Sequence, residues 1–380
     1  MLWTKDANRM CGAEMPRQKN ADQPPLLPGF RTPKEAFRDL RNYLAGQVVG
    51  ATRDETLLDE LLKVLFCKLY VERGLGDPSE PNSDPFEVAN RVRTIFGKVR
   101  LDFRDIYPDG TEILLDPQAI CRILEVCDFP LTEAGADPIG DAFEVFIGSE
   151  ARGRSGQFFT PQPVTDLLVE ALAPKPDETV IDPACGAGGF LTAVARHFSA
   201  NGVPPTAIAE YSTRNLYGID KDDYLAKLAR MHVALLTGGH PRIYCGDSLA
   251  MQNGNGGLDR DLPKRGFDVL LTNPPFGVKI VAAKPEVLRK FDLARRWRPE
   301  PRTGRLQPTG EFLSQVPPQV LFVERCLALL RDGGRLGMVV PESLLSNKSY
   351  RHVVEFILAN ADVEAVIGMP EALFKTSGKG

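Results

Sequence analysis

The sequence predicts an α/β domain with a mostly parallel sheet, preceded by an all-helical N-terminal domain. From about residue 156, short apolar runs of strand length alternate with helical patterns, as in a parallel sheet covered by helices on both faces. Between residues 33 and 150 the apolar residues recur at the three-to-four spacing of amphipathic helices. The chain has 380 residues, a length typical of two or three domains. We therefore predict a flexible leader at 1–32, a helical domain at 33–150 and the α/β domain at 151–380.

Aspartate residues mark helix starts in the helical domain. Asp54 precedes a run of leucines at helical spacing that ends near Gly74. Asp84-Pro85 and Asp116-Pro117 open two more helices, because proline in the first turn loses no hydrogen bond that the helix needs. A further short helix holds Phe143 and Phe146 and closes the domain.

Six apolar runs are predicted to form the sheet of the α/β domain, at 179–181, 216–219, 243–245, 269–271, 336–340 and 363–367. Helices are expected between most of them, at 189–200, 224–236, 319–330 and 350–359. Sheets of this kind bind ligands beyond the carboxyl ends of their strands, close to the point where the strand order reverses. Functional residues are therefore expected directly after strands.

Composition excludes several classes of protein. With 43% hydrophobic and 25% charged residues the chain is neither disordered nor collagen-like. Its seven cysteines form no CxxC pair, and they indicate reduced, packed thiols of a cytoplasmic protein rather than a zinc or disulfide scaffold. No uncharged stretch approaches the roughly 20 residues of a membrane helix. The net charge of −4 means that any surface for nucleic acid must be local.

A glycine-rich turn follows the first strand, in the string Asp182-Pro183-Ala184-Cys185-Gly186-Ala187-Gly188-Gly189-Phe190. Glycines at a strand-to-helix turn let the backbone approach a ligand closely and present helix N-terminal amides to it. Glycine can also serve the geometry of such a turn alone. We expect Asp182, Gly186, Ala187 and Gly188 to belong to a cofactor site.

Two aspartates follow the next two strands. Asp220 can accept hydrogen bonds from both ribose hydroxyls of a nucleoside cofactor, although a strand-end aspartate is often a solvated turn residue. Asp247, in Gly246-Asp247-Ser248, can accept a bond from an adenine amine of the cofactor, and a simple aspartate turn fits it equally well.

The string Asn273-Pro274-Pro275-Phe276 after the fourth strand carries the most specific chemistry. An exocyclic amine on a nucleobase is a poor nucleophile, because its lone pair is delocalised into the ring. The Asn273 side-chain oxygen and the Pro274 carbonyl can accept its N–H bonds and stabilise the charge that develops in the transition state. Pro275 stiffens the loop, and Phe276 offers a ring on which an extruded base can stack. These four residues are the predicted catalytic group.

With these motifs the sequence resembles the class I adenosylmethionine-dependent N6-adenine DNA methyltransferases of the γ arrangement, and specifically the modification (M) subunit of type I restriction–modification systems. The resemblance runs from about residue 35 to the end and includes a segment before the glycine turn, formed by Gln157, Phe158, Phe159, Thr160, Pro161 and Gln162. It implies that this segment and Gly186–Gly188 hold S-adenosylmethionine. It also implies that Asp220 holds the ribose and that Asn273–Phe276 take the target adenine. The family often has Thr or Ser where this chain has Ala187.

The resemblance implies double-stranded DNA and a specificity subunit as partners, with a restriction subunit as a further candidate, in the cytoplasm of a prokaryote and without a membrane. Residues 284–305 hold eight basic and three acidic side chains, and we expect a mobile loop there that contacts phosphates. Its candidate DNA-binding residues are Arg295, Arg296 and Arg298, and a solvated surface loop is the alternative. In the family a further antiparallel strand and a helical tail follow a segment like 374–380, so we expect a longer parent chain.

Two other functions fit the same residues. The acceptor could be RNA or a glutamine amide of a protein, since a loop of this kind serves any planar amide or amine. The chain could also be a DNA-binding component of a defence complex without turnover. Intact Asn273 and Asp182 favour an enzyme.

Overall fold

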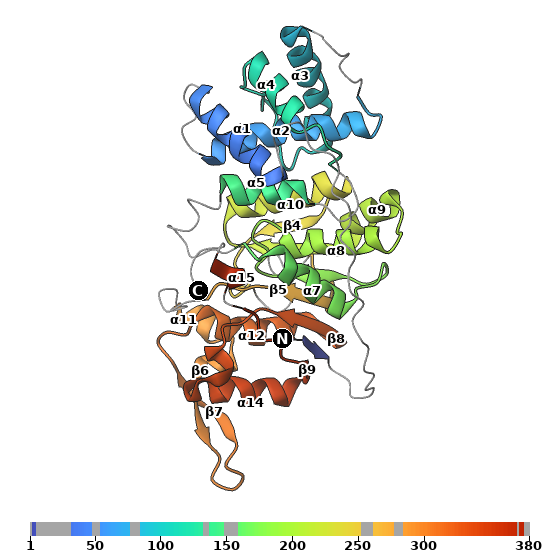
Figure 1. Ribbon diagram of the computed structural model, residues 1–380. Helices are drawn as coiled ribbons and strands as arrows, with labels where there is room; N and C mark the ends of the chain where they lie inside the picture. The colour runs from blue at the N-terminus through green and yellow to red at the C-terminus, as the bar shows by residue number, and fades with distance from the viewer. Residues whose placement is uncertain are drawn as a thin grey trace.

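The computed structural model of the protein describes residues 2–4, 32–47, 54–76, 84–131, 137–147, 159–251, 261–276, 284–370 and 372–375. Its helices α1 to α5 form a helical layer at the top of Figure 1, above the sheet. They are α1 (Pro33–Gln47), α2 (Asp54–Glu72), α3 (Pro85–Asp102), α4 (Pro117–Val126) and α5 (Pro138–Phe146). Helix α2 lies in the centre of this layer and is buried on most of its surface, so that even Glu60 and Lys63 are buried, as an ion pair of 2.5 Å.

The aspartates at the helix starts act in different ways. The Asp116 carboxylate caps α4 by accepting a hydrogen bond from the Ala119 N–H at 2.8 Å. Asp84 precedes α3 but makes no capping bond with its side chain, so Pro85 alone favours the helix start there. Asp54 lies inside the first turn of α2, and its carboxylate accepts a hydrogen bond from Arg41 Nε at 2.9 Å.

A seven-stranded sheet with the order β4-β3-β2-β5-β8-β1-β9 forms the second part of the chain. The strands β2 (Val180–Asp182), β3 (Leu216–Asp220), β4 (Arg242–Cys245), β5 (Phe267–Thr272) and β8 (Leu330–Met338) are parallel to their neighbours among these five. With β9 (Asp362–Ala365), they confirm the six predicted strands, five of them to within two residues at each end, whereas β8 begins six residues before its predicted start. The chain returns from β4 at one edge to β5 beside β2, so the order of the strands reverses between β2 and β5.

The seventh strand, β1 (Leu2–Thr4), comes from the segment predicted to be a flexible leader. It pairs antiparallel with β8 on one side and with β9 on the other. The prediction was therefore wrong for residues 2–4, because backbone pairing on both edges places a strand too short to show periodicity in the sequence. Residues 5–31 of the predicted leader lie outside the described residues.

Helices cover both faces of the sheet (Figure 1). On one face lie α7 (Gln162–Leu172), α8 (Gly189–Ala200), α9 (Pro205–Asn215) and α10 (Asp223–Thr237), which share an apolar core with β2 and β3. On the other face lie α12 (Pro318–Leu329) and α14 (Arg351–Asn360). Helices α7 and α9 were not predicted from the sequence. In the described part of the chain, no helix combines the length and the apolar composition needed to cross a bilayer.

Helix α10 joins the helical layer to the sheet. Its Leu228 and Met231 are buried in the core of the helical layer, whereas Ala229 and Val233 pack toward the sheet. An ion pair of 2.8 Å between Lys227 on α10 and Asp59 on α2 adds a polar contact to this junction.

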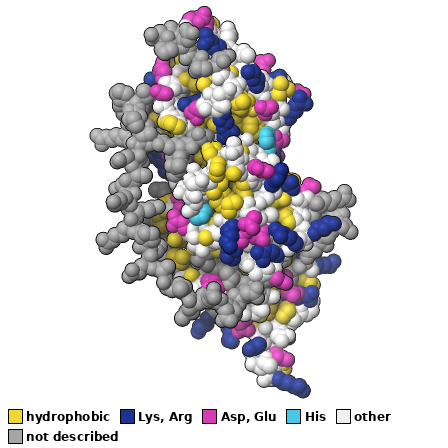
Figure 2. Space-filling view, turned by 90° about the vertical axis from the view of Figure 1, so that its right-hand side faces the viewer, with side chains coloured by type: hydrophobic (Ala, Val, Ile, Leu, Met, Phe, Trp, Pro, Cys, Tyr) yellow, Lys and Arg dark blue, Asp and Glu magenta, His cyan; other side chains and the backbone are white. Residues whose placement is uncertain are grey.

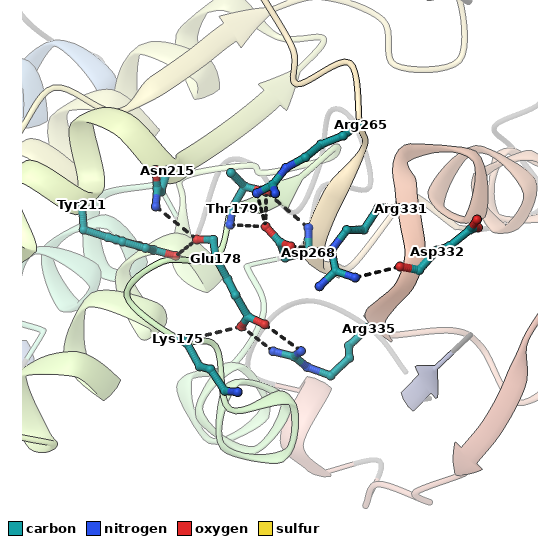
Figure 3. A network of polar contacts seen from close by, with 10 residues as sticks. All are labelled: Lys175, Glu178, Thr179, Tyr211, Asn215, Arg265, Asp268, Arg331, Asp332 and Arg335. Atoms are coloured by element: carbon teal, nitrogen blue, oxygen red, sulfur yellow. Dashed lines mark hydrogen bonds and ion pairs between the residues drawn. The ribbon is translucent and has the colours of Figure 1, made fainter. Parts of the chain in front are cut away.

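A network of charged side chains ties the amino ends of β2, β5 and β8 together, at the end of the sheet opposite the predicted site (Figure 3). The buried Asp268 carboxylate accepts bonds from the Thr179 N–H at 2.7 Å and from Arg331 Nε at 2.5 Å. Burial alone would raise the pKa of Asp268, but these donors lower it to about 2. Next to it, both nitrogens of the Arg335 guanidinium donate to the Glu178 carboxylate at 2.9 and 2.6 Å.

The segment 284–305 contains regular structure, so the prediction of a mobile loop was wrong. It comprises α11 (Pro285–Leu288), the 3-10 turn η2 (Asp292–Ala294) and β6 (Arg295–Pro299), which pairs antiparallel with β7 (Leu306–Phe312). The hairpin projects at the bottom of Figure 1. Trp297 anchors it, because its ring packs edge-on against Phe356 of α14 at 6.3 Å between centroids.

Short elements complete the chain after the hairpin: α13 (Ser343–Ser346), η3 (Lys348–Tyr350) and α15 (Ala372–Lys375).

Candidate active site

The candidate site lies where the order of the strands reverses. Asp182 ends β2, and Asn273 follows the neighbouring strand β5 directly. Asp220 ends β3, on the other side of β2. The parallel pairing of these strands brings the predicted glycine turn, Asp220 and the Asn273 loop to one edge of the sheet.

The glycine turn has a backbone that side chains do not readily adopt. Gly186 and Gly188 have φ angles of 51° and 85°. A Cβ on Gly188 would lie 3.3 Å from the Ala229 Cα, so the turn also lies tightly against α10. The Cys185 N–H donates to the Ile219 carbonyl at 3.0 Å, which holds the turn against β3. The result is a backbone cradle at the N-terminus of α8, a geometry suited to an approaching ligand.

The Asp220 carboxylate is bonded to the glycine turn. Its Oδ2 accepts a hydrogen bond from the Gly186 N–H and its Oδ1 one from the Asp222 N–H, both at 2.9 Å. Burial raises the pKa of Asp220 more than these N–H donors lower it. Each oxygen keeps a further lone pair, which is what a pair of ribose hydroxyls would need.

Asp182 lies beneath the turn and is 1% exposed. Its Oδ1 accepts bonds from the Thr272 hydroxyl at 2.7 Å and from the Ala184 N–H at 3.0 Å, so one carboxylate joins β2, β5 and the start of the turn. Burial raises its pKa to about 7. The sequence analysis did not find Thr272, because a threonine at the end of an apolar strand gives no signal of its own.

Asp247 uses both of its carboxylate oxygens locally. Oδ1 accepts from the Leu249 N–H at 3.0 Å, the bond expected of a simple aspartate turn, and Oδ2 pairs with Lys221 Nζ at 3.2 Å. A contact to a cofactor amine stays a prediction. The neighbouring Ser248, which was not predicted, is buried and donates to the Pro183 carbonyl at 2.6 Å.

Two predicted segments meet at Asn273. Its Nδ2 donates to the Thr160 hydroxyl at 3.1 Å, which fixes the orientation of the amide. Its Oδ1 is buried and accepts no hydrogen bond from any residue that the structure describes. A buried amide oxygen without a donor is unfavourable in a folded protein, and such groups mark places where a ligand completes the bonding. The donor that would satisfy it is an N–H or O–H group at the carboxyl end of β5.

The remaining residues of these segments are placed in part. Phe159 packs against the core of the helical layer, and Pro161 and Gln162 begin α7. Pro274 is buried, and Pro275 and Phe276 are half-buried. Gln157 and Phe158 lie outside the described residues.

The three candidate DNA-binding arginines lie on β6. Each has an acidic neighbour: Arg295 Nε lies 3.0 Å from Asp292, and Arg296 Nε lies 3.0 Å from Glu311. Arg298 lies 3.9 Å from the same Glu311 carboxylate and is the most exposed of the three. In Figure 2, basic side chains reach the tip of this projection at the bottom of the molecule. Contact with DNA stays a prediction.

The sheet and its site define the class of fold: that of the class I S-adenosylmethionine-dependent methyltransferases. A chain from Listeria monocytogenes described as such a methyltransferase superposes with a TM-score of 0.50 and 19% identity over 84% of each chain. A chain from Vibrio vulnificus YJ016, described as a modification subunit of a type I restriction enzyme, superposes with a TM-score of 0.54 and 19% identity. That match covers 88% of this chain and 76% of the other.

The chain belongs to the N-6 DNA Methylase family, whose sequence model matches residues 134–379. Curated relatives include the type I restriction enzyme EcoEI methylase subunit of Escherichia coli, 24% identical over 73% of this chain and 51% of the relative. The EcoKI methylase subunit of Escherichia coli K12 is 24% identical over 87% of this chain and 62% of its own length. The chain thus spans about half to three fifths of these relatives.

Proposed function

We propose that this chain transfers a methyl group from S-adenosylmethionine to the N6 amino group of adenine in DNA, as the modification subunit of a restriction–modification complex. One observation carries the proposal: the buried Asn273 Oδ1, to which no described residue donates, next to the glycine cradle at the reversal point of the sheet. Membership of the N-6 DNA Methylase family supports the same reaction.

The residues that would hold the cofactor fit its chemistry. S-adenosylmethionine, when bound, supplies a methyl group activated by the positive sulfonium next to it. Gly186 and Gly188 let the backbone approach the cofactor closely, and the free lone pairs of Asp220 suit two adjacent ribose hydroxyls. Asp182 supports the cradle from below through its bonds to Thr272 and Ala184.

The Asn273 loop would bind and activate the target amine. Asn273 Oδ1 and the Pro274 carbonyl accept the two N–H bonds of the amine, which raises electron density on nitrogen as it attacks the methyl carbon. With S-adenosylmethionine bound, the nitrogen–carbon bond would form as the carbon–sulfur bond breaks, and the amine would then lose one proton to solvent. Phe276 stacks on the extruded base and keeps its amine in line with the methyl group.

The partners follow from the relatives rather than from this chain alone. The curated relatives are methylase subunits of type I restriction enzymes, which supports DNA as the substrate and a specificity subunit as the partner that reads sequence. A restriction subunit is a further candidate partner. The arginines of β6 would contact phosphates near the extruded base, as a local basic surface on a chain of net charge −4.

The test is transfer of tritiated methyl groups to duplex DNA, with and without a co-expressed specificity subunit. Wild-type protein with its specificity subunit should label the DNA. Asn273→Ala should lower the rate by about 100-fold or more, since it removes the acceptor that stabilises the positive charge developing on the amine. Cofactor affinity should stay within about threefold, because Asn273 Oδ1 would bond to the target amine and not to the cofactor. Normal cofactor binding with no transfer in either case would favour a DNA-binding component without turnover.

A further inference from the structure

A buried cluster of charged side chains links the helical layer to the cofactor cradle. Asp137, the residue that caps α5, is reached from α8 by Arg196 Nη1 at 2.6 Å and from α10 by His232 Nε2 at 2.7 Å. The side chains of these three residues are at most 8% exposed. Asp166 on α7 completes the cluster with a bond of 2.7 Å to the second Arg196 nitrogen. In Figure 1, α5 lies directly against α10 at the junction of the two parts.

Both ring nitrogens of His232 face oxygen atoms of other residues. Its Nε2 faces the Asp137 carboxylate, and its Nδ1 faces the Ala187 carbonyl at 2.8 Å. The ring therefore joins the Asp137 carboxylate to the Ala187 carbonyl. Arg196 pairs with both Asp137 and Asp166, so its buried guanidinium has a carboxylate partner on each side. Burial alone would raise the pKa of Asp137, but the charges of His232 and Arg196 hold it below its ordinary value.

The Ala187 carbonyl belongs to the middle residue of the cradle. Ala187 lies between Gly186 and Gly188, the two glycines with positive φ. Its methyl group is buried in the same apolar core as the helical layer, so both its side chain and its carbonyl face that layer. A turn built on glycines has few conformational limits of its own. The contacts of Ala187 therefore restrict the cradle from outside.

We propose that Asp137 and His232 are positioning residues that hold the glycine cradle in its binding shape, and that they couple the docking of α5 to cofactor affinity. Asp137 fixes the ring of His232, and His232 fixes the Ala187 carbonyl. The part of this proposal that concerns affinity rests on the proposed cofactor. The structural part, that the cluster restrains the cradle, is independent of which cofactor binds.

The chain offers a matched control for this link. The ion pair between Asp59 and Lys227 also joins the helical layer to α10 at 2.8 Å, but neither residue contacts the cradle in the described structure. Asp59→Asn weakens the same junction without releasing Ala187. This variant therefore distinguishes the effect of a weaker contact between the helical layer and α10 from the effect of a cradle that has lost its shape.

Two substitutions of His232 separate its two bonds. A glutamine amide nitrogen reaches the position of Nε2, so His232→Gln keeps a donor for Asp137 and loses the bond to Ala187. An asparagine nitrogen reaches the position of Nδ1, so His232→Asn keeps the bond to Ala187 and loses Asp137. If His232 holds the cradle through Ala187, His232→Gln should weaken cofactor binding more than His232→Asn does.

The experiment measures two properties of the whole chain: amide hydrogen exchange of residues 183–190 without cofactor, and the Kd of S-adenosylmethionine by calorimetry. In Asp137→Asn and His232→Gln, exchange should rise and Kd should rise by about tenfold, the loss expected for one hydrogen bond. In Asp59→Asn both should stay within about threefold of wild type, and in His232→Asn both should rise less than in His232→Gln.

Equal exchange at 183–190 in all four variants and wild type would overturn the proposal, as would an equal Kd in His232→Gln and His232→Asn. A wild-type chain that binds no S-adenosylmethionine would instead contradict the proposed function, and the exchange data would still decide whether the cluster restrains the cradle. Thermal unfolding of each variant identifies any substitution that prevents folding, and the His232→Gln and His232→Asn pair then decides between the outcomes.

Discussion

The bond between Thr160 and Asn273 gives a prediction that separates catalysis from cofactor binding. The resemblance to the γ amino-methyltransferases assigns Thr160 to the cofactor, whereas its hydroxyl accepts a bond from Asn273 Nδ2 at 3.1 Å. Thr160→Val removes that hydroxyl and keeps the shape of the side chain. The Asn273 amide then loses the bond that aims its Oδ1 at the target amine.

The size of the effect follows from this single bond. A neutral hydrogen bond of this kind contributes about 1 kcal/mol, and misdirection of the acceptor adds to the loss in the transition state. We expect kcat to fall by about 5- to 20-fold, because about 1.4 kcal/mol corresponds to a tenfold change. The loss stays smaller than that of Asn273→Ala, which removes the acceptor itself.

The assay is steady-state methyl transfer to duplex DNA, with the Kd of S-adenosylmethionine measured in parallel. Thr160→Ser is the matched control, because it keeps the hydroxyl and should keep kcat within about threefold of wild type. If Thr160→Val instead raises Kd by about tenfold with kcat unchanged, Thr160 binds the cofactor and does not orient Asn273. That result would refute the reasoning.

Three further predictions concern charge. In the folded state the pKa of Asp182 is about 7, above its ordinary 3.8, so ionisation of this carboxyl disfavours the folded state. The free energy of unfolding should therefore fall by up to about 4 kcal/mol as pH rises from 4 to 7. Asp182→Asn should flatten this part of the pH profile of Tm. The pKa of Asp268 is lowered to about 2, so its contribution to the stability of the fold is present above pH 4 and is lost as pH falls toward 2. Asp268→Asn should lower the free energy of unfolding, measured in urea at pH 7, by about 3 kcal/mol. Joint replacement of Arg295, Arg296 and Arg298 by alanine should reduce the steepness of the plot of log DNA-binding constant against log salt concentration by up to about 3. Glu311→Gln should strengthen DNA binding, because it removes the carboxylate next to Arg296 and Arg298. Unchanged slopes would show that the hairpin does not contact phosphates.

The parallel sheet could be predicted because its strands are buried on both faces. β5 is buried at every position, and β2 is as well, so both appear in the sequence as continuous apolar runs. Because these two strands could be located, Gly186 and Asn273 could be placed after their carboxyl ends. The hairpin of β6 and β7 could not be recognised in the same way, because most of its side chains are exposed. Its contacts with α14, among them those of Trp297 and Leu306, depend on the tertiary structure.

The contacts within the site depended on tertiary structure that the sequence does not encode locally. The Asn273 motif predicted an acceptor for an amine, but its bond to Thr160 joins residues 113 positions apart. His232 has no local partner in the sequence, because Asp137 is 95 positions away and its other partner is a backbone carbonyl. The Asp137-Pro138 pair did carry a local signal, that of a helix start, and it was overlooked.

The most direct test of the central claim is the identity of the methylated product. Duplex DNA incubated with the chain, its specificity subunit and S-adenosylmethionine should be digested to nucleosides and measured by mass spectrometry. The account predicts N6-methyl-deoxyadenosine in the wild-type reaction and its loss with Asn273→Ala. Methylation of cytosine, or methyl transfer only to RNA or to protein, would contradict it.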